Sequence, residues 1–221
     1  MSERRPLSRG HGYGAVLVLV LVSASFLVAA PDAGWARLVS IGLGAATLVT
    51  AVRTVRAPHA LARAAAAATA VLALATVIVV IVRGDVPEAP AALVNGLMIV
   101  VAPVVIGAGL VRDIRAEGII VRTLSGVLAI YLLIGMVFAL AGIAVAAIDD
   151  GTYFAGEADP TRSDFLYFSY VTLSTTGYGD LSPVTDVGRM LAVIEALFGQ
   201  IYLVTVVAMI VANLRPRAVR E

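Results

Sequence analysis

The chain has 221 residues, of which 60% are hydrophobic and 14% are charged, and its formal net charge is +1. Because a soluble domain carries about 25% charged residues, this composition argues against a soluble protein and favours a membrane protein. The absence of cysteine excludes disulfides, zinc–thiolate sites and a thiol nucleophile, and basic residues confined to short loops argue against a nucleic-acid partner.

Six apolar segments are long enough to cross a membrane, which takes roughly 20 residues for about 30 Å of hydrocarbon. In chain order, these segments are 13–30, 35–52, 62–82, 90–111, 123–148 and 189–214. The second is the weakest, because Arg37 and Arg53 shorten its uncharged run. The first also resembles a secretory signal peptide, but Pro31 after two alanines argues against cleavage, so we expect an uncleaved helix.

The arginines are distributed unequally between the two sides that six crossings would create. Twelve of the sixteen fall on the side of both termini, whereas most acidic residues fall on the opposite side. Positive residues favour the cytoplasmic side of a membrane. We therefore expect a multi-pass protein of the cell (plasma) membrane with both termini cytoplasmic.

The segment between the last two spans has an unusual pattern. Residues 149–163 are acidic and contain Gly and Pro, so we expect an exposed outer loop. The next stretch, Asp164–Thr176, is apolar and aromatic but too short to span, and Ser163 and Asp164 are its candidate N-caps. It predicts a half-helix that dips in from outside, followed by irregular chain in "GYGDLSP". Irregular backbone at membrane depth requires burial by protein or a water-filled cavity; the alternative is an amphipathic hairpin at the interface.

This irregular stretch resembles the filter signature of the potassium channel family. The matching residues are Thr175, Thr176, Gly177, Tyr178, Gly179 and Asp180. The resemblance covers residues 123–214 and implies an all-α membrane protein. Its six transmembrane helices would have a re-entrant pore helix and a selectivity-filter loop between helices 5 and 6, and four chains would form the pore.

With this resemblance, the chain is expected to divide into five regions. They are a cytoplasmic N-terminus (1–12), a four-helix transmembrane domain (13–111), a cytoplasmic linker (112–122), a pore domain (123–214) and a cytoplasmic tail (215–221).

The motif has a physical reason. An ion in a narrow pore must replace its hydration shell, and inward-pointing backbone carbonyls can do so. One chain offers one strip of carbonyls, so a closed ring needs a homotetramer. Left-handed backbone angles bring successive carbonyls to one side, and glycine adopts them at little cost, which accounts for Gly177 and Gly179. The resemblance implies K⁺ at Thr175, Thr176, Gly177 and Tyr178, with a Thr175 hydroxyl ring, Tyr178 pointing away from the ion, and no cofactor.

Several positions depart from the family pattern. Thr176 stands where the family often has Val, and Val171 stands where some members have an acidic residue that supports the filter. Aromatic bracing is expected from Tyr167, Phe168 and Tyr170, where either tyrosine, but not Phe168, is able to donate a hydrogen bond to Tyr178. With Asp180, these residues form the expected filter support, and their identity puts filter inactivation in question.

The last predicted span contains a glycine and an apolar stripe that are candidate parts of a pore. Gly199 is a candidate gating hinge or, equally, a site of close helix packing. Leu203, Val207 and Val211 follow at helical spacing as candidate pore-lining residues or as a packing face.

Glu195 is the only acidic residue inside a predicted span, and an intramembrane ionisable group is a functional candidate. At a rise of ~1.5 Å per residue it lies about 9 Å below the outer end of the span, near the back of the filter. We hypothesise that it accepts hydrogen bonds from Tyr or Thr groups of the pore helix and so replaces the support lost at Val171. The alternative is a protonated or snorkelling carboxyl group with a packing role.

The fourth span, 90–111, has no charged residue, and Arg112 and Arg115 are expected beyond its cytoplasmic end. Because one charge crossing 100 mV supplies only about 2.3 kcal/mol, we expect little or no voltage sensing. His11 and His59 are candidate pH sensors in cytoplasmic segments, against the alternative of no role.

Together, these features predict a potassium-selective channel that is not an enzyme, with membrane lipids and three further copies of the chain as partners. The alternatives are a poorly selective cation channel and a secondary transporter that uses the Gly-rich segment as a substrate loop. A membrane enzyme is disfavoured, because the spans contain no catalytic constellation of His, carboxylate or Ser.

Overall fold

The computed structural model describes residues 12–31, 33–55, 67, 71, 88–117, 121–148, 153–156 and 159–213. Most of the predicted span 62–82 lies outside these residues, as do His11, His59 and both termini. Within the described part, the regular elements are all α-helices. They are α1 (Tyr13–Ala29), α2 (Gly34–Val55), α4 (Glu88–Glu117), α5 (Val121–Ile148), α6 (Arg162–Leu173) and α7 (Asp186–Asn213).

Four of the described helices contain segments that are long and apolar enough to cross a membrane. These segments are Gly34–Val55, Val94–Arg115, Thr123–Ala147 and Asp186–Met209. The helix α1 is also apolar but has only 17 residues. The all-helical class predicted for a membrane protein is therefore confirmed for the described part of the chain.

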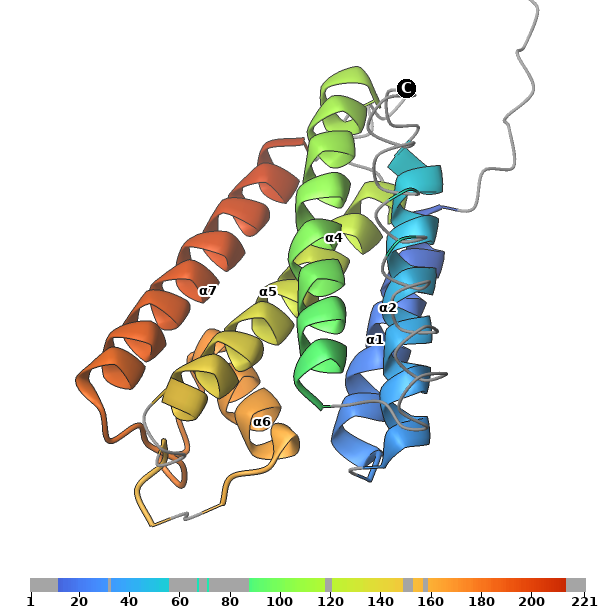
Figure 1. The fold of residues 1–221 in the computed structure, drawn as a ribbon. Coiled ribbons are helices and arrows are strands. Elements are labelled where there is room, and N and C mark those ends of the chain that lie inside the picture. Colours follow the sequence, from blue (N-terminus) through green and yellow to red (C-terminus); the bar gives the residue numbers. More distant parts are fainter. Residues whose placement is uncertain are drawn as a thin grey trace, which may run out of the picture.

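The helices form two groups joined by α5 (Figure 1). The first group is α1, α2 and α4, which stand side by side, with α2 against both α1 and α4. The second group is α6 and α7, and α5 contacts both of these helices as well as α1 and α4. Among the described helices, α7 contacts only α5 and α6, so most of its surface faces outward at the edge of the molecule.

The end of α4 lies farther along the chain than predicted. The helix continues past residue 111 to Glu117, so Arg112 and Arg115 lie within its last turns and not beyond its end. Arg112 donates a hydrogen bond to the Val55 carbonyl oxygen at the end of α2. The Tyr13 hydroxyl donates to Asp113 over 2.9 Å and ties α1 to the same end of α4. These contacts give the polar turn of α4 partners, which explains why the helix extends beyond its apolar run.

The short helix α6 begins earlier than predicted. Its N-cap is Thr161, whose hydroxyl accepts from the Asp164 backbone N–H, while the Asp164 carboxylate accepts from the Thr161 backbone N–H. This capping box satisfies two amide donors of the first turn. Ser163 and Asp164 were therefore wrong as candidate N-caps. The helix has 12 residues, which is too few to span a membrane, as predicted.

The segment before α6 is not wholly exposed, contrary to the prediction for 149–163. Tyr153 and Phe154 are buried, and they pack with Phe165 and Phe168 of α6 at ring-centroid distances of 5.1–6.4 Å. The two aromatic residues belong to the same buried apolar cluster as Phe165 and Leu166 of α6. An acidic, Gly-containing loop thus carries two core residues.

Candidate functional site

The predicted filter, residues 175–179, is a short irregular strip that follows soon after the end of α6. Three of its residues have positive φ in strict alternation: Thr175 at 57°, Gly177 at 55° and Gly179 at 78°. The expectation that Gly177 and Gly179 use left-handed angles is confirmed. Thr175 adopts the same conformation without being glycine, which its residue type does not predict.

The backbone amides of the strip point back toward α6. Thr175 N–H donates to the Thr172 carbonyl oxygen over 2.9 Å, and the N–H groups of Thr176 and Gly177 both donate to Val171 over 2.9 and 3.3 Å. By contrast, the carbonyl oxygens of residues 175–179 accept no hydrogen bond from any described residue. The strip therefore has backbone acceptors without a partner among the described residues, and it follows the C-terminal end of α6, which favours a cation.

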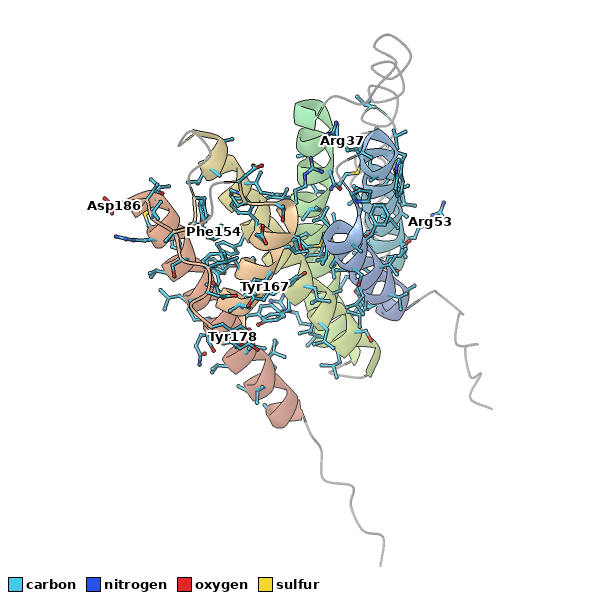
Figure 2. All side chains as sticks on the ribbon, turned by 90° about the horizontal axis from the view of Figure 1, so that it is seen from below. Arg37, Arg53, Phe154, Tyr167, Tyr178 and Asp186 are labelled. Atoms are coloured by element: carbon cyan, nitrogen blue, oxygen red, sulfur yellow. The ribbon has the colours of Figure 1, made fainter. Side chains whose placement is uncertain are left out.

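The side chains of the strip are exposed in the single chain. Tyr178 is 71% exposed and lies with Phe154 and Tyr167 on the α6–α7 side of the molecule, away from Arg37 and Arg53 (Figure 2). The Thr176 hydroxyl is 2.8 Å from the Ser174 hydroxyl. The hydroxyl at the position where the family often has Val thus has a partner at the C-cap of α6, whereas Tyr178 is not buried by its own chain.

The aromatic residues of α6 make contacts around the site, but neither tyrosine donates the expected hydrogen bond to Tyr178. The Tyr167 hydroxyl donates to Asp180 over 2.8 Å, and this hydrogen bond raises the pKa of the Tyr167 phenol. The Tyr170 hydroxyl donates to the Leu132 carbonyl oxygen of α5 over 2.9 Å. Phe168 packs in the aromatic cluster with Tyr153 and Phe154. Each expected support residue therefore has a contact, with Asp180 in place of Tyr178 as the acceptor.

The segment after the strip, residues 182–184, is held by backbone pairing with residues 153–155. Ala155 N–H donates to the Ser182 carbonyl oxygen over 2.9 Å, and Val184 N–H donates to Tyr153 over 3.0 Å. Phe154 and Pro183 form the antiparallel bridge between the two segments. The strip is thus fixed to α6 at its start and to residues 153–155 at its end.

Glu195 of α7 is buried against α6 and is 2% exposed. As hypothesised, it hydrogen-bonds to α6, but its partner is the Ser169 hydroxyl and not a Tyr or Thr group. The same hydroxyl is 2.6 Å from the Gly135 carbonyl oxygen of α5. Sequence reasoning missed Ser169, because nothing in the local pattern distinguishes it from serines that bond to their own helix.

The other predicted residues of α7 occupy two environments. Gly199 packs against α6, because a Cβ atom at this position would overlap the Leu173 carbonyl group. This is the close packing that the sequence analysis gave as the alternative to a hinge. Leu203 and Val207 are exposed and line an open apolar groove with Val204, Ala208 and Ala212. The Val211 side chain lies outside the described side chains.

The donor groups at the site do not include a cluster of metal-ligating side chains. Within the described ranges, no group of three or more His, Cys, Asp or Glu residues is placed to hold a metal ion. The acceptors that the strip offers are backbone carbonyls and threonine hydroxyls. Such neutral oxygens suit a weakly bound monovalent cation that must leave again.

Known proteins are similar to the C-terminal part of the chain, which contains the candidate site. Residues 126–215 match a family described as "Ion channel". The chain is 39% identical over 71 residues to two-pore potassium channel 5 of Arabidopsis thaliana, which is 32% of this chain and 17% of that protein. It is 35% identical over 79 residues to the potassium voltage-gated channel protein shk-1 of Caenorhabditis elegans, which is 33% of this chain and 15% of that protein.

A third relative is potassium voltage-gated channel subfamily A member 5 of Homo sapiens, with 30% identity over 89 residues, or 40% of this chain and 14% of that protein. The alignments thus cover less than a fifth of the length of these relatives. No solved structure matches the chain. The resemblance predicted for residues 123–214 is confirmed over nearly the same range.

Proposed function

We propose that the chain is the subunit of a potassium-selective channel, proceeding from the ion-channel family that residues 126–215 match. Four copies would surround one axis and conduct K⁺ passively through a ring of backbone carbonyls. The observation that carries this proposal is the strip from Thr175 to Gly179, with alternating left-handed residues and carbonyl oxygens that accept no hydrogen bond from the described residues.

The unpaired carbonyls favour an ion site over a simple turn. Residues 175–179 are exposed in the single chain, but four assembled copies would enclose their carbonyls, and an enclosed acceptor without a partner costs free energy. A desolvated cation supplies the missing partner, and the carbonyls in turn replace its water. In this proposal, Thr175, Thr176, Gly177 and Tyr178 contribute the oxygens that bind K⁺, and the Thr175 hydroxyl adds a ring at the inner end.

The surface of the single chain supports assembly into a homotetramer. The exposed face of α7 is apolar along its length and includes Met190, Val193, Leu197, Ile201 and Val204. Such a face needs lipid or protein to cover it. Neighbouring subunits would cover part of this face and would also pack against Tyr178, which its own chain leaves exposed.

The remaining parts of the proposal follow the charge pattern. The first four spans would form a peripheral domain without a voltage sensor, since the two arginines of α4 lie only in its last turns and Arg112 bonds to α2. Residues 1–12, 112–122 and 215–221 would be cytoplasmic, and the protein would lie in the plasma membrane. Gly199 as a hinge, and Leu203, Val207 and Val211 as pore-lining residues, belong to the same proposal.

The test is the reversal potential of the purified protein in planar bilayers with K⁺ on one side and Na⁺ on the other. We expect the potential to lie near the potassium equilibrium value. Gly177→Ala tests the strip itself, because an added Cβ meets no atom within 4 Å while the φ of 55° becomes strained. Gly42→Ala, in equally open space on α2, is the matched control. Gly177→Ala should abolish selectivity or conduction, and Gly42→Ala should preserve both.

Other outcomes identify the alternatives. Equal permeability to both ions would contradict potassium selectivity and would indicate a poorly selective cation channel. Saturable flux coupled to a second gradient, carried by a single chain, would indicate a secondary transporter.

A further inference from the structure

The Ser169 hydroxyl occupies a position with two acceptors and one hydrogen. Its oxygen contacts both the Gly135 carbonyl oxygen, at 2.6 Å, and the Glu195 carboxyl group. A hydroxyl donates only one hydrogen bond. If Glu195 were ionised, one of these two contacts would join two acceptors without a proton between them. If Glu195 carries a proton, its O–H donates to Ser169 and the Ser169 O–H donates to Gly135.

The charges around Glu195 also favour the neutral acid. The α5 helix has no charged residue between Thr123 and Ile148, and in α6 the only charged residues are Arg162 and Asp164 in its first turn. On α7 itself, Asp186 and Arg189 lie at the outer end. A buried carboxylate without a cationic partner is strongly disfavoured, and 2% exposure leaves Glu195 little access to water.

We propose that Glu195, Ser169 and the Gly135 carbonyl form a proton-carrying clamp that joins α7, α6 and α5 behind the filter, so that the filter conducts only while Glu195 is protonated. The clamp rests on the proposed channel function. Loss of the proton to bulk water at alkaline pH would leave an ionised carboxylate facing Ser169 and break the chain of donors. Because α6 holds the amides of Thr175, Thr176 and Gly177, displacement of α6 would disturb the strip.

Two tyrosines also lie near Glu195 and must be separated from it in a pH experiment. Tyr131 comes from α5, where its hydroxyl donates to the Leu173 carbonyl oxygen, and Tyr153 comes from the outer segment. Burial raises the pKa of Tyr153 to about 12, so its phenol stays neutral at moderately alkaline pH. Replacing Glu195 alone therefore isolates its titration from that of Tyr153.

The first test is K⁺ flux from lipid vesicles at neutral and moderately alkaline pH. We expect the wild type to lose flux about tenfold at the higher pH, as the loss of one buried hydrogen bond can produce. Glu195→Gln should conduct at both pH values, because its amide N–H still donates to Ser169. Asp186→Asn, an exposed acid at the outer end of the same helix, is the matched control and should keep the wild-type pH dependence.

Flux of the wild type that does not change with pH, or the same loss in Glu195→Gln, would overturn the clamp. So would a folded Glu195→Gln protein without flux at neutral pH.

The second test needs no ion flux. Infrared difference spectra of wild type against Glu195→Gln at neutral pH should contain the C=O band of a protonated carboxyl group, and Ser169→Ala should shift this band because the acid loses its acceptor. Ser40→Ala, whose hydroxyl bonds to the Ala36 carbonyl of its own helix, should not. A wild-type spectrum without the band overturns the clamp. Absence of K⁺ flux at every pH with the band present would instead contradict the channel function.

Discussion

Thr175 has a φ of 57°, the only positive value at a non-glycine residue in the part of the chain that the structure describes. Left-handed angles at a β-branched residue are strained and cost on the order of 1–3 kcal/mol. The hydrogen bond from its N–H to Thr172 partly offsets this cost. A glycine would relieve the strain but would remove the hydroxyl, so the position keeps a threonine where the backbone alone would favour glycine.

At the same scale, Gly199→Ala is expected to weaken the contact between α6 and α7. The added methyl group would overlap the Leu173 carbonyl group, which is backbone and cannot turn aside. Since Leu173 ends α6 just before the strip, we expect a lower thermal unfolding temperature in detergent and, if the proposed function holds, reduced K⁺ flux.

The control for this substitution is Gly42→Ala, where the added methyl group meets no atom. There the higher helix propensity of alanine should stabilise the protein by about 0.5–1 kcal/mol. If Gly199→Ala matched this control in stability, the close packing at Gly199 would not constrain the two helices.

Both ends of α6 have hydrogen-bonded contacts. Its N-terminus has the Thr161–Asp164 capping box, and its C-terminal carbonyls at Val171 and Thr172 accept the amides of the strip. Tyr170 and Tyr131 add hydrogen bonds between α6 and α5 at Leu132 and Leu173. A helix of 12 residues is marginal alone, so these contacts and its packing determine its stability.

Thr161→Ala should therefore loosen the first turn of α6. Loss of an N-cap hydroxyl costs about 1 kcal/mol, which corresponds to about fivefold faster local opening. The measurement is hydrogen–deuterium exchange of the amides at residues 162–165, where Thr161→Ser should exchange like the wild type. Equal exchange in the alanine and serine variants would show that the cap does not stabilise this turn.

The ends of the helices could be predicted where the apolar run of the sequence determines them, but not where contacts with other helices do. The span ends at Ala29 and Ile148 were within about one residue, because long apolar runs mark a membrane helix clearly. The end of α4 was missed by six residues, because Arg112 finds its acceptor on α2, and spacing along one helix does not reveal this contact. The burial of Tyr153 and Phe154 was missed because their neighbours in sequence are acidic.

For the candidate site, the left-handed conformation of the glycines could be predicted from the sequence, but the hydrogen bond between Ser169 and Glu195 could not. Gly177 and Gly179 follow from a backbone rule that the sequence displays directly. The hydrogen-bond partners of Ser169 depend on which side of α6 faces α5 and α7, and the sequence alone does not reveal this. Ser23, Ser40 and Thr47 show the commoner outcome, in which a helical hydroxyl bonds to the carbonyl four residues earlier.

For the whole molecule, the outward face of α7 predicts association of identical chains. Since the chain has no cysteine, a single introduced cysteine can form a disulfide only with another copy. We expect at least one of Val193→Cys, Leu197→Cys and Ile201→Cys to form dimers on oxidation, whereas Val104→Cys on α4, which is even more exposed, should not.

Light scattering in detergent should give a protein mass of four times the 22.8 kDa chain. A mass of one chain, with no cross-linked dimer in any α7 variant, would contradict the tetramer.

The anchoring of the strip at both ends has a consequence for how subunits come together. Its start is tied to α6, and its end is tied to residues 153–155 and, through Asp180, to Tyr167, all within one polypeptide. Each subunit would therefore present a strip that is already shaped before it meets its neighbours. Preorganisation of this kind lowers the entropy lost on association. Four subunits would then associate with little change in the conformation of each strip. A substitution that distorts the strip would already distort it in the single chain, before assembly.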